Sequence, residues 1–270
     1  MSAQTASAQA FSRDLADKVA IVTGGSQGVG EAIAREFASR GVAGLLLTGR
    51  NVERGEAVAA SLTTTSCKAI FRAADLADLD AVKGIVPAAE AAFGRLDILV
   101  NAAGDTDRGS ILDTSPELYE RIMGVNLRAP FFLIQDAAAL MRRRKIEGAI
   151  VNIQSMSAHG GQPFLTTYSV SKGALATLTK NVAYGLLKDR IRVNGLNIGW
   201  MATPGEDAIM KLRHGVQDGW LDEAVKSQPF GRLIDPREVA KAVAYLASTE
   251  SGLMTGANID FDQSILGAHD

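Results

Sequence analysis

Apolar, β-branched runs alternate with stretches of helical periodicity along most of the chain. The apolar runs predict short buried strands over residues 18–23, 42–48, 68–74, 96–100, 149–153, 190–196 and 258–261. The periodic stretches predict helices between them, the longest over residues 115–143 and 166–188. Regular alternation of this kind predicts an α/β fold, a doubly wound parallel sheet of about seven strands with helices on both faces.

A glycine-rich turn joins the first predicted strand to the first helix. Residues 23–30 read TGGSQGVG, and helical periodicity follows from Glu31 to Arg40. Glycines let the backbone approach a pyrophosphate, and the amino end of the following helix attracts its negative charge. The pattern alone fits a tight turn, but its place between strand and helix favours nucleotide binding. The residues expected to contact the nucleotide are Gly24, Ser26, Gln27, Gly28, Val29 and Gly30.

The loop after the second predicted strand bears on the choice of cofactor. Sites for NAD usually place an acid about 20 residues past the glycines, where it bonds the ribose 2′-hydroxyl. Here Arg50 lies 20 residues past Gly30, and no acid occurs before Glu53. An arginine suits a 2′-phosphate, so the sequence favours NADP over NAD. The alternative is that Arg50 is a solvated loop residue that selects no phosphate.

Two further segments follow predicted strands and are expected beside the same nucleotide. Asp75 and Leu76 follow the third strand, where an acid can reach an adenine amino group, although a helix cap at Asp78 or Asp75 is the alternative. Small residues follow the fourth strand and permit close approach of a cofactor; they are Asn101, Ala102, Ala103 and Gly104.

The stretch from Ser155 to Lys172 carries the candidate catalytic residues. Ser155 follows a buried strand, at the edge where open α/β sheets bind ligands. Tyr168 and Lys172 lie four residues apart and share one face of a predicted helix. A lysine ammonium favours the phenolate and should lower the tyrosine pKa from its usual value near 10. With the serine hydroxyl, the pair suits proton transfer at an alcohol or carbonyl oxygen.

A second set of residues repeats this spacing. Tyr184 and Lys188 are also four apart, and Ser171 precedes Tyr184 as Ser155 precedes Tyr168. Ser171 and Tyr184 are predicted on one unbroken helix, about 20 Å apart at 1.5 Å per residue. They therefore cannot meet, whereas glycines and a proline between Ser155 and Tyr168 allow the chain to fold back.

Other candidate site residues lie near these motifs. Asn126 sits in an apolar helical stretch, where burial without a partner is costly, so we predict a hydrogen-bonded structural role or a place in a proton path. His159 is a candidate substrate contact, as is Trp200, for which core packing is the alternative. An amphipathic segment follows the sixth strand, and we predict a substrate lid around residues 200–226.

Composition adds limits. The 270 residues suit one domain over residues 17–270, preceded by a flexible tail over residues 1–16. A net charge of −2 argues against nucleic acid and anionic membranes as partners, and no apolar run is long enough to span a membrane. The single cysteine, Cys67, has no disulfide partner, and no Cys/His cluster suggests a metal site. A cytoplasmic location is predicted by default, because no secretory signal is present.

These motifs resemble, in order and spacing, those of the short-chain dehydrogenase/reductase (SDR) family in its compact single-domain branch. The resemblance covers residues 17–264 and rests on residues 23–30, 75–76, 101–104, 126, 155, 168–172 and 192–194. It implies a Rossmann fold, a nicotinamide cofactor and a catalytic tetrad of Asn126, Ser155, Tyr168 and Lys172. Tyr168 would be the general acid/base, Ser155 would orient the substrate oxygen, Lys172 would bond the nicotinamide ribose, and Asn126 would support a proton relay.

The resemblance also implies further contacts, an assembly and an activity. Gly199 and Thr203 would contact the cofactor, although Ile198-Gly199 replaces the usual Pro-Gly, and residues 260–264 lack the usual Asp-Gly-Gly ending. Similar proteins are often homotetramers, with a homodimer as the alternative. The expected activity is an NAD(P)-dependent oxidoreductase that interconverts a secondary alcohol and a ketone, with a sugar or polyol favoured. The alternatives are a 3-oxoacyl-thioester reductase, whose carrier protein would meet the basic residues 142–145, and a non-catalytic NADP-binding sensor or scaffold.

Overall fold

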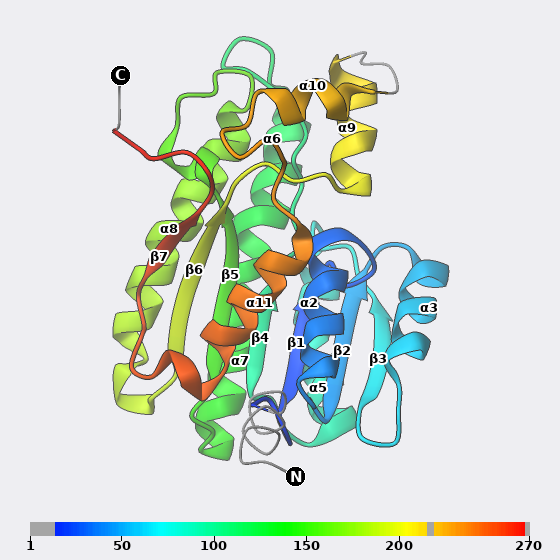
Figure 1. Cartoon of the computed structure of the whole chain (residues 1–270). Coiled ribbons are helices and arrows are strands. Elements are labelled where there is room, and N and C mark those ends of the chain that lie inside the picture. The colour runs from blue at the N-terminus through cyan, green and yellow to red at the C-terminus, as the bar shows by residue number, and fades with distance from the viewer. Residues whose placement is uncertain (1–13, 215–218, 268–270) are drawn as a thin grey trace.

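The computed structural model describes residues 14–214 and 219–267. In these residues one sheet of seven parallel strands has the order β3-β2-β1-β4-β5-β6-β7. The strands are β1 (Val19–Thr23), β2 (Gly44–Gly49), β3 (Lys68–Ala73), β4 (Ile98–Asn101), β5 (Ala149–Ser155), β6 (Arg192–Ile198) and β7 (Asn258–Phe261). The predicted doubly wound parallel sheet is confirmed, and helices cover both of its faces (Figure 1).

The helices follow the predicted pattern with some differences in their bounds. They are α2 (Gly28–Ser39), α3 (Val52–Leu62), α4 (Leu79–Lys83), α5 (Ile85–Phe93), α6 (Pro116–Met123), α7 (Ala129–Arg144), α8 (Thr166–Gly185), α9 (Pro204–His214), α10 (Trp220–Lys226) and α11 (Pro236–Ala247). No helix in the described part of the chain combines the length and apolar character that crossing a membrane requires.

The core lies in two layers, one on each face of the sheet. Successive strand residues point to opposite faces, so Ala20 and Val22 of β1 pack into one layer and Ile21 into the other. Side chains from α2 and α11 complete the first layer, and side chains from α5 and α7 complete the second. Because both faces are covered, the β1 sequence VAIVT is apolar throughout.

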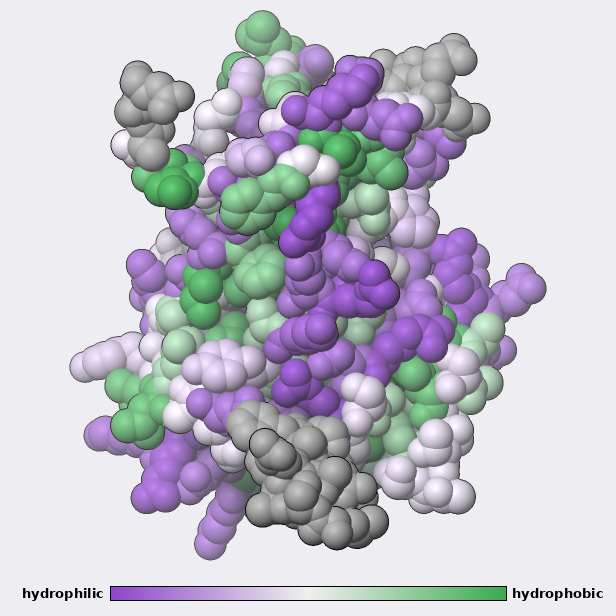
Figure 2. All heavy atoms as spheres, in the orientation of Figure 1, coloured by the Kyte–Doolittle hydropathy of each residue, from purple (hydrophilic) through white to green (hydrophobic). Residues whose placement is uncertain are grey.

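The outer faces of the helices meet solvent. Figure 2 shows the side of the molecule on which α2 and α11 lie, and hydrophilic residues cover most of it. The apolar faces of these helices point inward, as the burial of Phe37 in α2 and Val243 in α11 illustrates. This polar-out, apolar-in division is what amphipathic helices on a buried sheet require.

Strand order reverses between β1 and β4, and this places the functional site. Chain connections from β1 run to β2 and β3 on one side, and those after β4 run to β5, β6 and β7 on the other. Loops at the carboxyl ends of β1 and β4 therefore diverge and leave a crevice between them. The glycine turn at Gly24 follows β1 and residues 102–104 follow β4, so both predicted nucleotide-binding segments lie at this crevice.

The structure differs from the predicted elements in two places. The predicted helix over residues 115–143 contains a π-helical turn at Gly124–Arg128, which separates α6 from α7. Residues 14–16, expected in the tail, pack onto the domain instead: Leu15 is fully buried, and Asp14 lies 2.9 Å from Arg40 in an ion pair. The remainder of the predicted tail, residues 1–13, and residues 215–218 of the predicted lid lie outside the described residues.

Candidate active site

A cavity of about 820 Å³ opens at the carboxyl ends of β1, β4, β5 and β6. Most of the predicted site residues line it. They are Gly24, Ser26, Gln27, Gly28, Val29, Gly30, Arg50, Asp75, Leu76, Ala102, Ala103, Gly104, Ser155, Tyr168, Lys172, Gly199, Trp200 and Thr203. The cavity is therefore continuous from the glycine turn to the Ser155–Lys172 stretch.

The glycine turn is shaped by close backbone approach. A Cβ atom on Gly30 would lie 2.3 Å from the carbonyl oxygen of Gly24, closer than any real contact. Gly24 itself has a φ of +69° and packs against the backbone of Ala103, where a Cβ would lie 3.0 Å from its Cα. The turn thus forms an open cradle of backbone groups at the amino end of α2. A dinucleotide pyrophosphate fits such a cradle.

The far end of the cavity carries the predicted adenine and ribose contacts. Arg50 is exposed at the cavity edge, directly after β2. Asp75 is exposed, and one of its carboxylate oxygens accepts a hydrogen bond from the backbone N–H of Ala77 at 3.0 Å. Asp78, and not Asp75, caps α4, since its side chain accepts from the N–H of Asp80. Of the two residues for which a helix cap was the alternative, Asp78 is the cap and Asp75 is not.

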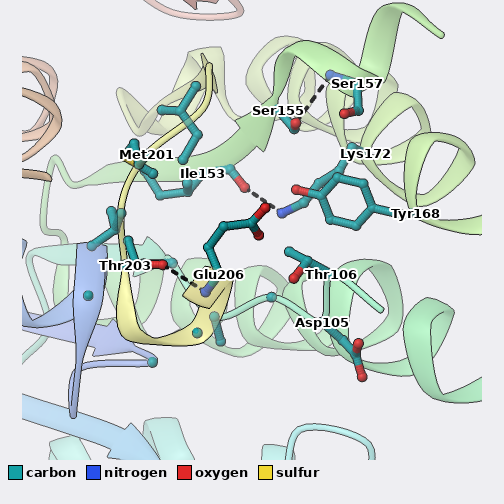
Figure 3. Close-up of a pocket in the computed structure, with 18 of the residues that line it drawn as sticks. Asp105, Thr106, Ile153, Ser155, Ser157, Tyr168, Lys172, Met201, Thr203 and Glu206 are labelled. Carbon is teal, nitrogen blue, oxygen red and sulfur yellow. Dashed lines mark hydrogen bonds between the residues drawn. The ribbon is translucent and has the colours of Figure 1, made fainter. Parts of the chain in front are cut away.

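Ser155, Tyr168 and Lys172 converge at the other end of the cavity, where Figure 3 shows them side by side. Ser155 is the last residue of β5, and its hydroxyl acts to lower the pKa of the Tyr168 hydroxyl. Lys172 follows one helical turn later, and its Nζ lies 5.7 Å from the centre of the tyrosine ring. The ammonium donates a 2.9 Å hydrogen bond to the carbonyl oxygen of Ile153. All three side chains are buried.

Burial governs the acidity of this group. The pKa of Tyr168 is raised, first by burial and also by the negative charge of Glu206, although the Ser155 hydrogen bond and the positive charge of Arg108 oppose the change. Burial lowers the pKa of Lys172 to about 8. The expected lowering of the tyrosine pKa is therefore wrong for this structure. The Lys172 ammonium lies over the tyrosine ring and donates to a main-chain carbonyl. The loss of water around the phenol destabilises the phenolate and raises the tyrosine pKa.

The buried lysine should cost stability. Its folded pKa of about 8 lies below the ordinary value of 10.5, so the unfolded chain holds more protons between these values. The penalty is full below pH 8 and fades as pH rises to 10.5. We expect Lys172→Met to raise the free energy of unfolding by about 1–3 kcal/mol at pH 7, and by less at pH 10. Urea denaturation at both pH values measures this.

An exposed lysine on the same helix supplies the control for that measurement. Lys180→Met on α8 should leave the free energy of unfolding within about 0.5 kcal/mol of the parent value at both pH values. A Lys172→Met variant that is less stable than the parent at pH 7, or whose advantage is independent of pH, would contradict the burial penalty.

Asn126 lies behind the cavity, in the π-helical turn, and is fully buried. Its side-chain oxygen accepts from the N–H of Asp105 at 2.8 Å, and its Nδ2 donates to the carbonyl oxygen of Asp105 and to the Ser171 hydroxyl. It therefore ties the loop after β4 to α8. A Cβ on Gly104 would lie 3.6 Å from both the Asn126 amide oxygen and the Lys172 Nζ. Both groups therefore border the space that a side chain at position 104 would fill. The predicted hydrogen bonding of the Asn126 side chain is confirmed, and its place in a proton path stays a prediction.

Two predicted contacts lie elsewhere. Asn101 does not line the cavity; it is buried in β4, and its Nδ2 donates to the side chain of Asn152 at 2.8 Å. His159 does not line the cavity either, because its ring turns toward β7, where it lies 2.9 Å from the carboxylate of Asp260. The loop of small residues after β4 is expected to approach a cofactor, but its first residue, Asn101, belongs to the strand interior.

The repeated spacing around Tyr184 forms no site. Ser171 and Tyr184 both belong to α8, Ser171 is fully buried, and Tyr184 is 81% exposed. The Ser171 hydroxyl donates to the carbonyl oxygen of Tyr168 and accepts from Asn126. Ser171 thus bonds residues of the Ser155–Lys172 site and forms no second site with Tyr184. In the described part of the chain, no group of His, Cys, Asp or Glu residues is arranged to hold a metal ion.

Segments after β6 and β7 complete the cavity. Trp200 lines it and stacks on Trp220 of α10, with ring centres 5.7 Å apart. Asp262 and Ser264 line it from beyond β7. Because Gly199 has no side chain, the Asp262 carboxylate lies against it; a Cβ there would be 1.8 Å from a carboxylate oxygen. The Ile198-Gly199 pair and the unusual ending after β7 are therefore structurally matched.

Glu206 and Arg108, two charged residues of the cavity that were not predicted, form an ion pair. Glu206, in the first turn of α9, accepts a 3.0 Å hydrogen bond from the guanidinium of Arg108 in the loop after β4. It also accepts from the indole N–H of Trp200 at 3.1 Å. The ion pair joins a loop residue to a helix residue 98 positions away, so no periodicity or motif signals it.

The chain is similar to known oxidoreductases along nearly its whole length. A family model described as enoyl-(acyl carrier protein) reductase matches residues 24–264. L-rhamnose 1-dehydrogenase (NAD(P)(+)) of Azotobacter vinelandii is 36% identical over 253 residues, which cover 92% of this chain and 96% of that protein. Galactitol 2-dehydrogenase of Agrobacterium fabrum is 32% identical over 254 residues, covering 92% and 97%.

Solved structures agree with the sequence matches. One, described as a short chain dehydrogenase/reductase family protein, superposes with a TM-score of 0.79 at 32% identity and covers 93% of this chain and 98% of that one. The similarity spans the glycine turn, the seven-stranded sheet and the Ser155–Lys172 stretch together. This chain therefore belongs to the short-chain dehydrogenase/reductase family of oxidoreductases.

Proposed function

We propose that the protein is a nicotinamide-dependent oxidoreductase that interconverts a secondary alcohol and a ketone, with a sugar or polyol as its substrate. The observation that carries the proposal is the buried Ser155, Tyr168 and Lys172 group in the same cavity as the glycine turn. A proton-transferring phenol beside a dinucleotide cradle is what an alcohol dehydrogenase requires.

The residues of the cavity divide into a holding set and a reacting set. The glycine turn would hold the pyrophosphate, Arg50 and Asp75 the adenosine end, and Thr203 the nicotinamide end of the cofactor. A bound nicotinamide cofactor supplies or accepts the hydride. The chain itself handles the proton.

Proton handling falls to four residues. In the phenolate form, the Tyr168 oxygen takes the proton from the substrate alcohol; in the phenol form, it returns that proton to the ketone oxygen. The Ser155 hydroxyl orients the substrate oxygen. Lys172 holds a positive charge close to the phenol and offers its remaining N–H donors to the cofactor ribose. Asn126 fixes the loop and helix between which the relay would run, through its bonds to Asp105 and Ser171.

Two features favour a polyhydroxylated substrate. The matched dehydrogenases named above are described as acting on L-rhamnose and galactitol. The cavity also carries polar side chains, since Arg108, Gln162, Glu206 and Gln228 line it beside apolar residues such as Phe164, Trp200 and Met210. A sugar or polyol offers the many hydroxyl groups that such a lining can bond.

The family-model description favours a second candidate, a reductase of acyl thioesters carried on a carrier protein. Its predicted docking patch, residues 142–145, ends α7 just before β5 and so lies at the amino edge of the sheet. The cavity lies at the carboxyl edge, roughly 20 Å away for seven strand residues. Arg142 pairs with Asp189, and Arg143 and Arg144 pair with Glu90. This placement speaks against carrier docking there.

A third candidate, a sensor or scaffold that binds NADP without chemistry, fits the buried lysine poorly. Lys172 lies almost wholly out of water with a lowered pKa, so its burial destabilises the fold. A catalytic role would explain why such a residue is retained. A chain that only bound the cofactor would gain stability by replacing it.

A substrate screen tests the proposal. The full chain is mixed with NADP or NAD and a panel of polyols, aldoses and simple secondary alcohols, and with the reduced cofactors and the matching ketones, including a 3-oxoacyl thioester. Absorbance of the reduced cofactor reports turnover. We expect the highest kcat/KM with a polyol or sugar. Tight cofactor binding without any turnover would favour the sensor, and turnover confined to the thioester would favour the second candidate.

The preference for NADP rests on Arg50 and is testable by one substitution. We expect Arg50→Asp to lower the ratio of kcat/KM for NADP to that for NAD by about 100-fold, because a carboxylate repels a 2′-phosphate and accepts from a 2′-hydroxyl. Lys241→Asp, an equal charge change at an exposed position on α11 outside the cavity, is the control. An equal ratio in the parent and Arg50→Asp enzymes would show that another group reads the ribose.

Assembly, domain organisation and location stay predictions. A homotetramer or homodimer is expected, and sedimentation of the full chain would distinguish these. A lid is expected around residues 200–226, and Figure 1 shows α9 and α10 of this segment beyond the carboxyl ends of the strands. A single domain is likewise expected from the length of the chain, and a cytoplasmic location by default.

A further inference from the structure

The carboxylate of Glu206 is held by one of its two oxygens. Both described donors, the Arg108 guanidinium and the Trp200 indole N–H, bond the same atom, Oε1, at 3.0 and 3.1 Å. Within the described residues, no hydrogen bond or ion pair reaches the second oxygen, Oε2. The side chain is only 15% exposed, so this oxygen has little water around it except within the cavity.

The position of this carboxylate is fixed from several sides. Glu206 begins α9, where its backbone N–H donates to the Thr203 hydroxyl at 3.2 Å. Trp200 is held by its stacking on Trp220 and by a main-chain bond from Ile234 to its carbonyl oxygen. Two segments, the loop after β4 and the stretch from β6 into α9, thus meet at one side chain. A carboxylate held in this way is preorganised to receive a ligand.

Glu206 also faces the reacting group. Figure 3 shows its carboxylate directed toward Tyr168 and Lys172 from the opposite wall of the cavity. Its negative charge is felt at the Tyr168 hydroxyl, whose pKa it raises. A substrate whose reacting oxygen bonds Ser155 and Tyr168 would therefore place its neighbouring atoms next to Glu206.

We propose that Glu206 is a specificity-determining residue, whose Oε2 accepts a hydrogen bond from a second hydroxyl group adjacent to the reacting carbinol of a polyhydroxylated substrate. The inference rests on the proposed function and names the feature that the substrate must carry. An ionised carboxylate is an acceptor only, so it selects O–H donors and disfavours anionic substrates. A hydrogen bond to a charged acceptor is about twice as strong as one between neutral groups, which makes it a strong selector.

The test compares two substrates that differ by one hydroxyl group. Butane-2,3-diol and butan-2-ol form one pair, and the best polyol of the screen with its analogue lacking the neighbouring hydroxyl forms another. For each we define selectivity as the ratio of kcat/KM for the hydroxylated substrate to that for its partner. Glu206→Gln keeps the size of the side chain and removes the charge. We expect it to lower selectivity about tenfold or more, mainly through the hydroxylated substrate.

The matched controls separate substrate recognition from other effects. Glu223→Gln changes an exposed glutamate of α10, in the same predicted lid, and should leave selectivity unchanged. Because removing the Glu206 charge also lowers the Tyr168 pKa, each rate is taken on the plateau of the variant's own pH profile. Thermal unfolding checks that each variant folds. Should Glu206→Gln fail to fold, Glu206→Asp, which keeps the charge but withdraws the oxygens by one methylene group, decides, and it too should lose selectivity.

The outcomes distinguish the inference from the function on which it rests. Loss of selectivity in Glu206→Gln with retained turnover of butan-2-ol supports the inference. An equal loss with both members of a pair, or no loss with either, overturns the inference and leaves the proposed function standing. A parent enzyme that turns over no alcohol or ketone with either cofactor overturns the proposed function and the inference together.

Discussion

Replacing Tyr168 with phenylalanine should lower kcat by about 1000-fold or more while cofactor affinity changes less than about threefold. Phenylalanine keeps the ring that packs beneath Lys172 and removes only the phenolic hydroxyl, whose pKa Ser155 acts to lower. No other described side chain of the cavity places a titratable hydroxyl beside Ser155. Steady-state turnover of the best substrate of the screen and titration of cofactor fluorescence measure the two quantities separately.

The repeated motif in α8 supplies the matched control for this substitution. Tyr184→Phe removes a hydroxyl of the same type from a tyrosine that is 81% exposed and sixteen residues further along α8. It should leave both kcat and cofactor affinity within about twofold of the parent values. A Tyr168→Phe enzyme that retains full turnover would remove Tyr168 from the reaction, whatever the family resemblance implies.

Adding one methyl group to Gly30 should damage the nucleotide cradle. The new Cβ of Gly30→Ala would lie 2.3 Å from the carbonyl oxygen of Gly24 and 3.0 Å from the backbone nitrogen of Gly25. Both atoms belong to the main chain, so the turn must open to relieve the clash. We expect cofactor affinity to fall by about 10- to 100-fold and the free energy of unfolding by about 1–3 kcal/mol. Fluorescence titration and urea denaturation measure these.

A second helical glycine tests whether the effect belongs to the turn. Gly185 ends α8, and an added Cβ there meets no atom within 4 Å. Gly185→Ala should leave cofactor affinity unchanged and the stability equal to or above that of the parent. Unchanged cofactor affinity in Gly30→Ala would mean that the turn has room that the structure does not show.

The sequence was enough to predict the sheet and the nucleotide end of the cavity. Buried parallel strands leave long apolar runs, and the order of strand, glycine turn and helix around Gly24 and Gly30 is local in the chain. The convergence of Ser155 with Tyr168 and Lys172 was also predictable, because a strand end, a break and a helix fix it within eighteen residues.

Long-range contacts and burial were not predictable in the same way. The Glu206–Arg108 pair forms only when loops from two strands meet. The Tyr168 pKa depends on how completely water is excluded, which spacing along a helix does not report. Asn126 lies in a π-helical turn that apolar periodicity alone cannot distinguish from an α-helix. Asn101 and His159 were predicted at the cavity because they lie close in sequence to site residues. In the structure, Asn101 bonds Asn152 inside the sheet, and His159 bonds the Asp260 carboxylate.

The contribution of the segment after β7 to the cavity wall has a practical consequence for handling the enzyme. Asp262 lies against Gly199, and Ser264 and Leu266 also line the cavity, so an affinity tag or a surface linker joined after residue 267 would stand at the substrate entrance. Asp14 and Leu15 precede β1 at the opposite edge of the sheet. Fusion partners and immobilisation chemistry therefore belong upstream of Asp14, where they leave the entrance open to diffusing reactants.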